Sequence, residues 1–220
     1  MVMDHPEAVH AAIPVKAAAE SKSRLSEVLR SRERERLTFT MLRDVVGVVS
    51  NSQALSDVVV VSPDSKILRF AVELGVRAVP ERESGLNRAV EQVTRWCLRN
   101  GADSVLILPS DIPLLTVDDV DRLIDLGSEQ RSVVVSPSSD GGTNALFRRP
   151  PEVIPPSFGS DSFREHLAAA EAVGIEAKVH RSPSIALDID APEDLGRLLD
   201  EPGETLTHRL LRELGISARL

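Results

Sequence analysis

The stretch DVVVVS at residues 57–62 holds four consecutive valines and is followed directly by Pro63-Asp64. A continuous β-branched run of this length predicts a strand that is covered on both faces. Residues 104–108 (SVLIL) and 132–136 (SVVVS) have the same character. Several fully buried strands in one chain are typical of a mostly parallel sheet.

Longer amphipathic segments alternate with these strands. The residues from Arg32 to Val49 place apolar side chains at helical spacing, and further helices are expected at 64–74, 85–98, 116–126, 161–172, 192–199 and 205–214. Further strands are expected at 11–15, 77–80, 145–148, 176–180 and 185–188. The alternation predicts an α/β fold with helices on both faces of the sheet, and ligands bind at the carboxyl ends of such strands. No repeat or linker interrupts it, so we expect one domain over residues 1–220.

The bulk composition excludes several classes of protein. The chain is 42% hydrophobic, which supplies a sizeable core, and its net charge of -8 argues against a general nucleic-acid binder. No apolar run approaches the roughly 20 residues that span a bilayer. The N-terminus does not have the pattern of a signal peptide. We therefore expect a cytoplasmic protein with no membrane or nucleic-acid partner.

Three carboxylates follow predicted strands. Asp111 lies in LPSDIPLL (108–115), and Asp188 and Asp190 lie in ALDIDAPEDL (186–195). Residues two apart in an extended segment face the same way, and Mg²⁺ prefers oxygen ligands, so the three predict a magnesium site. Two alternatives stay open. Asp111 is also typical of a turn that bonds its own backbone, and Asp190 of a capping box for the next helix.

A basic loop follows the first predicted strand, in IPVKAAAESKSRLS (13–26). It holds Lys16 and Lys22, two of only four lysines in the chain. Such side chains can bind a triphosphate. The loop has no glycine, so it is not a Walker loop, and the alternative is a solvated basic loop.

Three further segments carry polar groups. In ESGLNRAV (83–90), Asn87 lies at a helix start, where an amide can read a base edge or can be purely structural. Backbone N–H groups and hydroxyls are offered by SSDGGTNALF (138–147) and FGSDSFREH (158–166), the second of which opens a helix that favours an anion. The alternative is two ordinary turns. The five histidines show no metal-ligand spacing, so we expect them to be structural or at the surface.

Together these motifs resemble the CofC/FbiD family, the guanylyltransferases of deazaflavin-coenzyme biosynthesis. The resemblance runs from IPVK to DIDAPEDL, nearly the whole chain, and implies a Rossmann-like nucleotide-diphospho-sugar transferase fold and a homodimer. It also implies roles for individual residues. Mg²⁺ would be coordinated by Asp111, Asp188 and Asp190; the nucleotide would be bound by Lys16, Lys22, Arg24, Gly85 and Asn87; and a phosphorylated acid would be held by Thr143, Gly159 and Ser162.

The expected reaction joins GTP and 2-phospho-L-lactate into lactyl-2-diphospho-5'-guanosine and releases pyrophosphate. The acid's phosphate has a second pKa of about 6, so it attacks without a general base. The reaction still needs charge neutralisation, which Lys22 with the metal and its three aspartates would supply. The alternatives are phosphoenolpyruvate as the acceptor, a molybdenum-cofactor or sugar-phosphate nucleotidyltransferase, and an inactive nucleotide-binding scaffold. GGTNALF looks like the archaeal version, which favours 2-phospho-L-lactate, and the presence of all three carboxylates disfavours a scaffold.

Overall fold

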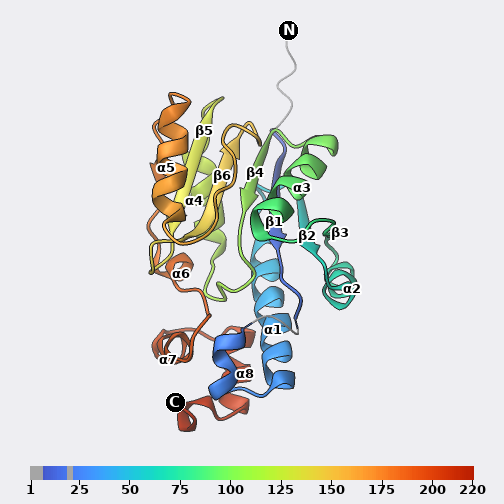
Figure 1. Ribbon diagram of the computed structural model, residues 1–220, viewed down its shortest axis with the longest axis vertical. Helices are drawn as coiled ribbons and strands as arrows, with labels where there is room; N and C mark the ends of the chain where they lie inside the picture. Colours follow the sequence, from blue (N-terminus) through green and yellow to red (C-terminus); the bar gives the residue numbers. More distant parts are fainter. Residues whose placement is uncertain (1–6, 19–21) are drawn as a thin grey trace.

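A computed structural model describes residues 7–18 and 22–220. The predicted basic loop therefore includes three residues, 19–21, that lie outside the described part. The described strands form one seven-stranded sheet in the order β3-β2-β1-β4-β6-β5-β7 (Figure 1). Their bounds are β1 (Val9–Pro14), β2 (Asp57–Ser62), β3 (Arg77–Pro80), β4 (Ser104–Ile107), β5 (Ser132–Pro137), β6 (Thr143–Arg149) and β7 (Lys178–Val179).

Strand β6 runs in the opposite direction to its neighbours. The pairs β1–β2, β2–β3, β1–β4 and β5–β7 are parallel, whereas β6 is antiparallel to both β4 and β5. The first residues of β6 therefore lie at the same edge of the sheet as the last residues of β1, β2, β3 and β4.

Helices fill the connections. The α-helices are α1 (Ser31–Val49), α2 (Ser65–Glu73), α3 (Leu86–Arg99), α4 (Val117–Leu126), α5 (Ser162–Ala172), α6 (Pro183–Ala186), α7 (Pro192–Asp200) and α8 (Leu206–Glu213), and two 3₁₀ helices are η1 (Ser23–Glu27) and η2 (Ile216–Ala218). Local capping sets several starts. Thr116 accepts from the Asp119 N–H while Asp119 accepts from the Thr116 N–H, which is a capping box at the start of α4. The predicted start of this helix is confirmed.

Alternate residues of β1 point to opposite faces of the sheet, as its period of two requires. Ala11 and Ile13 pack into a buried cluster with residues of α1, α2 and α4, whereas Ala12 packs into a second cluster with residues of α3 and α5. Helices therefore cover both faces, and the predicted α/β layering is confirmed.

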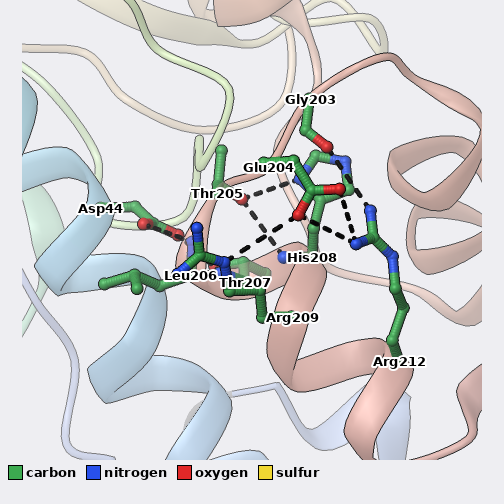
Figure 2. Close-up of polar contacts among 9 residues, drawn as sticks. All are labelled: Asp44, Gly203, Glu204, Thr205, Leu206, Thr207, His208, Arg209 and Arg212. Carbon is green, nitrogen blue, oxygen red and sulfur yellow. Dashed lines mark hydrogen bonds and ion pairs between the residues drawn. The ribbon is translucent and has the colours of Figure 1, made fainter.

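The C-terminal helices form a third apolar cluster against the first half of α1. Leu195 of α7 and Leu211 of α8 are fully buried there together with Leu25 of η1. Figure 2 shows how α8 is fastened: the Asp44 carboxylate of α1 accepts hydrogen bonds from the Leu206 and Thr207 N–H groups. The cluster anchors η1, and with it the basic residues on either side of Leu25.

One predicted strand is wrong. Residues 185–188 were expected to be extended, but Ser182 starts a short helix, because its carbonyl accepts from the N–H groups of Ile185 and Ala186. Pro183 at the first helical position favours that turn. The other predicted elements are present, with ends shifted by a few residues. None of the described helices is long and apolar enough to cross a membrane.

Candidate active site

A cleft of about 590 Å³ lies at the edge where β1, β2 and β4 end and β6 begins. Of the predicted site residues, all but Asn87 line it: Lys16, Lys22, Arg24, Gly85, Asp111, Thr143, Gly159, Ser162, Asp188 and Asp190. Segments up to 174 positions apart in the sequence, from Lys16 to Asp190, thus meet at one place, where open α/β sheets bind their ligands.

The strand order arranges the lining residues in a row. Glu81 follows β3, Pro63 follows β2, Lys16 follows β1, Asp111 follows β4, and Thr143 opens β6. Five neighbouring strands spaced about 4.8 Å apart span roughly 19 Å. The cleft is therefore long, with basic residues near its middle and hydroxyls at the β6 end.

The described residues of the basic loop are held in place near Ala18 and near Leu25. The Ala18 N–H donates to the Asp64 carboxylate at 3.1 Å, and Asp64 also caps α2. Leu25 is buried in the C-terminal cluster. Lys22 adopts φ 60, a left-handed conformation that is uncommon outside glycine and is found preferentially at functional sites. These contacts direct Lys22 into the cleft.

Lys22 joins two of the three carboxylates. Its Nζ lies 2.5 Å from Asp111 Oδ2 and 2.7 Å from Asp190 Oδ1, and its side chain is only 5% exposed. Burial lowers the pKa of Lys22, but the two carboxylates outweigh burial, so the net effect raises that pKa. Burial likewise raises the pKa of Asp190, and Lys22 more than reverses this. Lys22 and Asp190 are therefore both charged at neutral pH.

Asp188 has a different partner. It accepts a hydrogen bond from Asn144 Nδ2 at 3.1 Å, and the same amide donates to the Ile185 carbonyl at 2.8 Å. The pKa of Asp188 is raised to about 6, mainly by burial; the hydrogen bond from Asn144 acts against this rise, and the nearby Asp111 and Asp190 add to it. Our sequence interpretation missed Asn144; the signal was an amide directly before the apolar residues 145–147 of β6.

The two-residue spacing of Asp188 and Asp190 does not bring them together with Asp111 in the expected three-carboxylate cluster. No group of three or more His, Cys, Asp or Glu side chains in the described ranges is placed so as to hold a metal ion. The reason is that Lys22 lies between Asp111 and Asp190 while Asp188 is bonded to Asn144. Two carboxylates in contact with one ammonium nevertheless leave an excess of one negative charge at these contacts.

The alternative that the Asp190 side chain caps α7 is excluded by the hydrogen bonds at the start of that helix. The side chain that caps α7 is that of Asp194, which accepts from the N–H groups of Asp190 and Ala191 at 3.0 and 2.8 Å. The Asp190 carboxylate is bonded to Lys22 instead. Asp190 therefore belongs to the cleft rather than to the helix cap.

The predicted acceptor residues do come together. The hydroxyls of Thr143 and Ser162 are 3.1 Å apart and both buried. Gly159 beside them has φ 153, which favours glycine. Asp161, which would repel an anion, is exposed and does not line the cleft.

Asn87 requires a correction. Its amide was expected at the base, but Nδ2 donates to the Phe158 carbonyl at 3.1 Å and Oδ1 accepts from the Phe158 N–H at 2.7 Å. Asn87 thus fixes the segment that carries Phe158 and Gly159 into the cleft. The acidic group at the β3 end of the cleft is Glu81. Sequence reasoning missed Glu81, although it directly follows the predicted strand at 77–80.

Comparison with known proteins agrees with this geometry. Residues 9–220 match the family model described as "Guanylyl transferase CofC like". The chain is 43% identical to a phosphoenolpyruvate guanylyltransferase of Rubrobacter xylanophilus, over 86% of this chain and 93% of that one. It is 35% identical to a 2-phospho-L-lactate guanylyltransferase of Methanobrevibacter smithii, over 95% and 92%.

Solved structures show the same fold at lower identity. A Desulfovibrio desulfuricans G20 protein classed as a nucleotide-diphospho-sugar transferase superposes with a TM-score of 0.81 at 18% identity, over 97% of this chain and 98% of that one. A nucleotidyl transferase from Methanothermobacter superposes with a TM-score of 0.64 at 16% identity, over 94% and 99%. The fold is that of the nucleotide-diphospho-sugar transferases, and the family match over nearly its whole length shows that the chain belongs to the CofC-like guanylyl transferase family.

Proposed function

We propose that this protein transfers the guanylyl group of GTP to the phosphate of 2-phospho-L-lactate. The observation that carries the proposal is the row of groups along the cleft. Basic side chains lie between a carboxylate at the β3 end, Glu81, and a hydroxyl pair at the β6 end. A nucleotide with its base towards β3 would place its phosphates at Lys16 and Lys22 and leave the hydroxyl end to a small acid.

The chemistry needs alignment more than proton transfer. An oxygen of the acceptor phosphate attacks the α-phosphorus of GTP, a new P–O–P bond forms, and the bond from the α-phosphorus to the β-phosphate oxygen breaks. Pyrophosphate leaves with the electron pair. Lys16, Lys22 and Arg24 would bind phosphate oxygens and stabilise the charge that develops there. Because the acceptor phosphate is largely ionised at neutral pH, no side chain has to remove a proton.

Mg²⁺ is the cofactor we propose for this site. Asp111 and Asp190, with Asp188 behind them, are the residues that would hold it, because Mg²⁺ is usually bound by one or two carboxylates together with substrate phosphates. The excess of carboxylates over cations in contact supports this assignment. When bound, the ion would neutralise phosphate charge and orient the reacting groups.

Glu81 is the residue we propose for base selection. Guanine presents an N–H and an NH₂ donor side by side, and an ionised carboxylate is a pure acceptor that can take both. Burial raises the pKa of Glu81 and a hydrogen bond from the Gly85 backbone lowers it, while no basic residue in the described part of the chain contributes to its shift. Arg88 nearby pairs with Glu83 and Glu91 instead. The carboxylate is therefore available to a ligand.

A second acceptor, phosphoenolpyruvate, is favoured by the 43% identical relative from Rubrobacter. The two acids carry the same carboxylate and phosphate and differ only in a planar or tetrahedral C2. A pocket wall separates groups of such similar size by about 1–3 kcal/mol. We therefore expect activity with both acids.

The test is an acceptor and nucleotide screen scored by pyrophosphate release and product mass. GTP with 2-phospho-L-lactate should give lactyl-2-diphospho-5'-guanosine, and both acids in one tube should give the ratio of the two kcat/KM values. A ratio in favour of phosphoenolpyruvate would overturn the acceptor and keep the guanylyl transfer. Activity only with a molybdopterin or a sugar phosphate, or none with any acceptor, would overturn the proposal itself.

The resemblance also implies a homodimer, and we propose this on the resemblance alone. Light scattering on the purified protein measures the mass directly, and a mass near the 23.9 kDa of one chain would contradict the dimer.

A further inference from the structure

A buried chain of hydrogen bonds runs behind the hydroxyl end of the cleft. The Ser157 N–H donates to Nε2 of His166 at 3.0 Å, Nδ1 of His166 lies 3.1 Å from Thr143 Oγ1, and Thr143 Oγ1 lies 3.1 Å from Ser162 Oγ. His166 is fully buried on α5 and does not itself line the cleft. This series of hydrogen bonds begins at a backbone N–H group and ends at two hydroxyls that line the cleft.

The backbone donor fixes the tautomer of His166. A backbone N–H can only donate, so Nε2 must carry a lone pair. The proton of the neutral ring then lies on Nδ1 and is donated to Thr143. Protonating the ring would set an N–H against the Ser157 N–H, so the cationic form breaks the chain. Burial, helped by Arg148, lowers the pKa of His166 to about 4, which agrees with a ring that stays neutral.

Proton counting then determines what the hydroxyl pair offers. Thr143 and Ser162 together have two hydroxyl protons, and Thr143 Oγ1 already accepts the Nδ1 proton. One of the two hydroxyl protons lies between the two oxygens. The other has no acceptor among the described residues and is left for a ligand, whichever of the two oxygens carries it.

The nearest backbone donors are not available for the same purpose. Along the first turn of α5, the N–H of Ser162 donates to Gly159, that of Phe163 to Gly141, and those of Arg164 and Glu165 to Asp161. The expectation that this helix start would itself hold the anion is therefore not supported by these amides. The hydroxyl pair therefore supplies a donor that these four amides do not.

We infer that His166 is a positioning residue: its Nδ1 donates to Thr143, and this fixed direction leaves one hydroxyl proton of the Thr143–Ser162 pair for an anionic oxygen of the acceptor. The identity of that ligand rests on the proposed function; the proton direction does not. The acceptor's carboxylate or phosphate oxygen accepts such a proton, whereas a ligand with only donors at this position is rejected. His166 acts through Thr143 and does not touch the ligand.

The direct test is nitrogen-15 NMR of the histidine rings in the unmodified protein without substrates. Two-bond proton–nitrogen correlations report which ring nitrogen carries the proton, and His166→Gln identifies the signals by their loss. We expect the Nδ1-H tautomer, with no titration of this ring between pH 8 and pH 5. An Nε2-H tautomer, or a ring that titrates near its ordinary pKa of 6.5, would overturn the inference.

Kinetics test the consequence for the ligand. Thr143→Val keeps the shape but removes the hydroxyl, and should raise the KM of the acceptor by about tenfold or more, with the KM of GTP changed by less than about twofold. Thr143→Ser should restore the acceptor KM. His166→Gln keeps an acceptor for Ser157 but not a fixed donor to Thr143, and should shift the acceptor KM in the same direction. An unchanged acceptor KM in Thr143→Val would also overturn the inference. If the wild-type protein transfers no guanylyl group to either acid, the proposed function fails, and the tautomer still decides the proton direction.

Discussion

The ammonium of Lys22 lies 2.5 Å from a carboxylate oxygen of Asp111, 89 positions further along the chain. Its second contact, at 2.7 Å, is Asp190. One side chain therefore ties together the loop after β1, the loop after β4 and the segment before α7. The left-handed backbone of Lys22 is the local cost of this placement.

Replacing Lys22 tests whether its charge serves the reaction. Lys22→Met should lower kcat/KM by about 100-fold or more, because the cation that would face the phosphates is lost. Lys178→Met is a matched control, since Lys178 also bridges two acceptors, Glu129 and the Leu126 carbonyl, but lies outside the cleft. Steady-state rates and melting temperatures of both variants make the comparison. Equal activities would show that Lys22 only holds loops together.

Removing divalent cations tests the proposed cofactor. We expect no activity in EDTA and recovery with Mg²⁺. Asp111→Asn and Asp188→Asn should each lower turnover by several orders of magnitude, since a neutral amide is a poorer ligand than a carboxylate. Asp161→Asn is the control, because Asp161 is exposed beside the cleft and asparagine tolerates its left-handed backbone. Full activity in EDTA would exclude the metal.

Two glycines should respond oppositely to alanine. A Cβ on Gly127 would lie 2.1 Å from Cε1 of the fully buried Phe147, whereas a Cβ on Gly47, exposed within α1, would meet nothing within 4 Å. Gly127→Ala should lower the free energy of unfolding by about 1–3 kcal/mol through overpacking. Gly47→Ala should raise it by about 0.5–1 kcal/mol, because alanine favours a helix. Urea unfolding of the two variants measures both, and a stable Gly127→Ala would contradict the packing.

Much of the fold was predictable because its strands are local features. The run at 57–62 is β-branched throughout, and the structure places β2 at those residues. The antiparallel direction of β6 was not predictable, because it depends on which neighbours the strand finds rather than on its composition. The prediction of a strand at 185–188 was wrong for a related reason: Ile185 is fully buried, yet it packs from a short helix.

The sequence predicted which residues line the cleft better than it predicted which atoms each of them contacts. Lys16 and Asp111 were chosen for their positions after strands, and topology brings such positions together. The partners of each side chain depend on distances that no motif carries. The bonds of Asn87 to Phe158 and of Lys22 to Asp111 are therefore visible only in the structure.

His166 should make the protein less stable in mild acid. Burial lowers the pKa of His166 to about 4 in the folded chain, against 6.5 ordinarily. The unfolded chain therefore binds a proton first. The contribution of the neutral His166 ring to the free energy of unfolding is complete above about pH 6.5. It is lost as the pH falls towards 4, by up to about 3 kcal/mol.

Two other groups must be separated from that effect. The pKa of His10 is also lowered by burial and acts in the same direction, whereas the raised pKa of Asp188 acts in the opposite one. The comparison is therefore between the wild-type protein and His166→Gln, by urea unfolding at pH 7.5 and pH 5. The wild type should lose more stability between these values than the variant. Equal losses would contradict a buried neutral His166.

Base preference should depend on Glu81. With GTP, a glutamine at this position keeps one acceptor but places an NH₂ donor against a guanine donor. Glu81→Gln should therefore weaken the preference for GTP over ATP by about 1–3 kcal/mol, on the scale of one bidentate base contact. The change should lie mainly in the KM of the nucleotide, because Glu81 lies at the opposite end of the cleft from Thr143 and Ser162. The control is Glu83→Gln, since Glu83 lies outside the cleft and interacts with Arg88. Competition between GTP and ATP in one reaction, read by product mass, gives the ratio of specificities. A preference for guanine that is the same in both variants would move base recognition away from Glu81 to the backbone around Ser84 and Gly85.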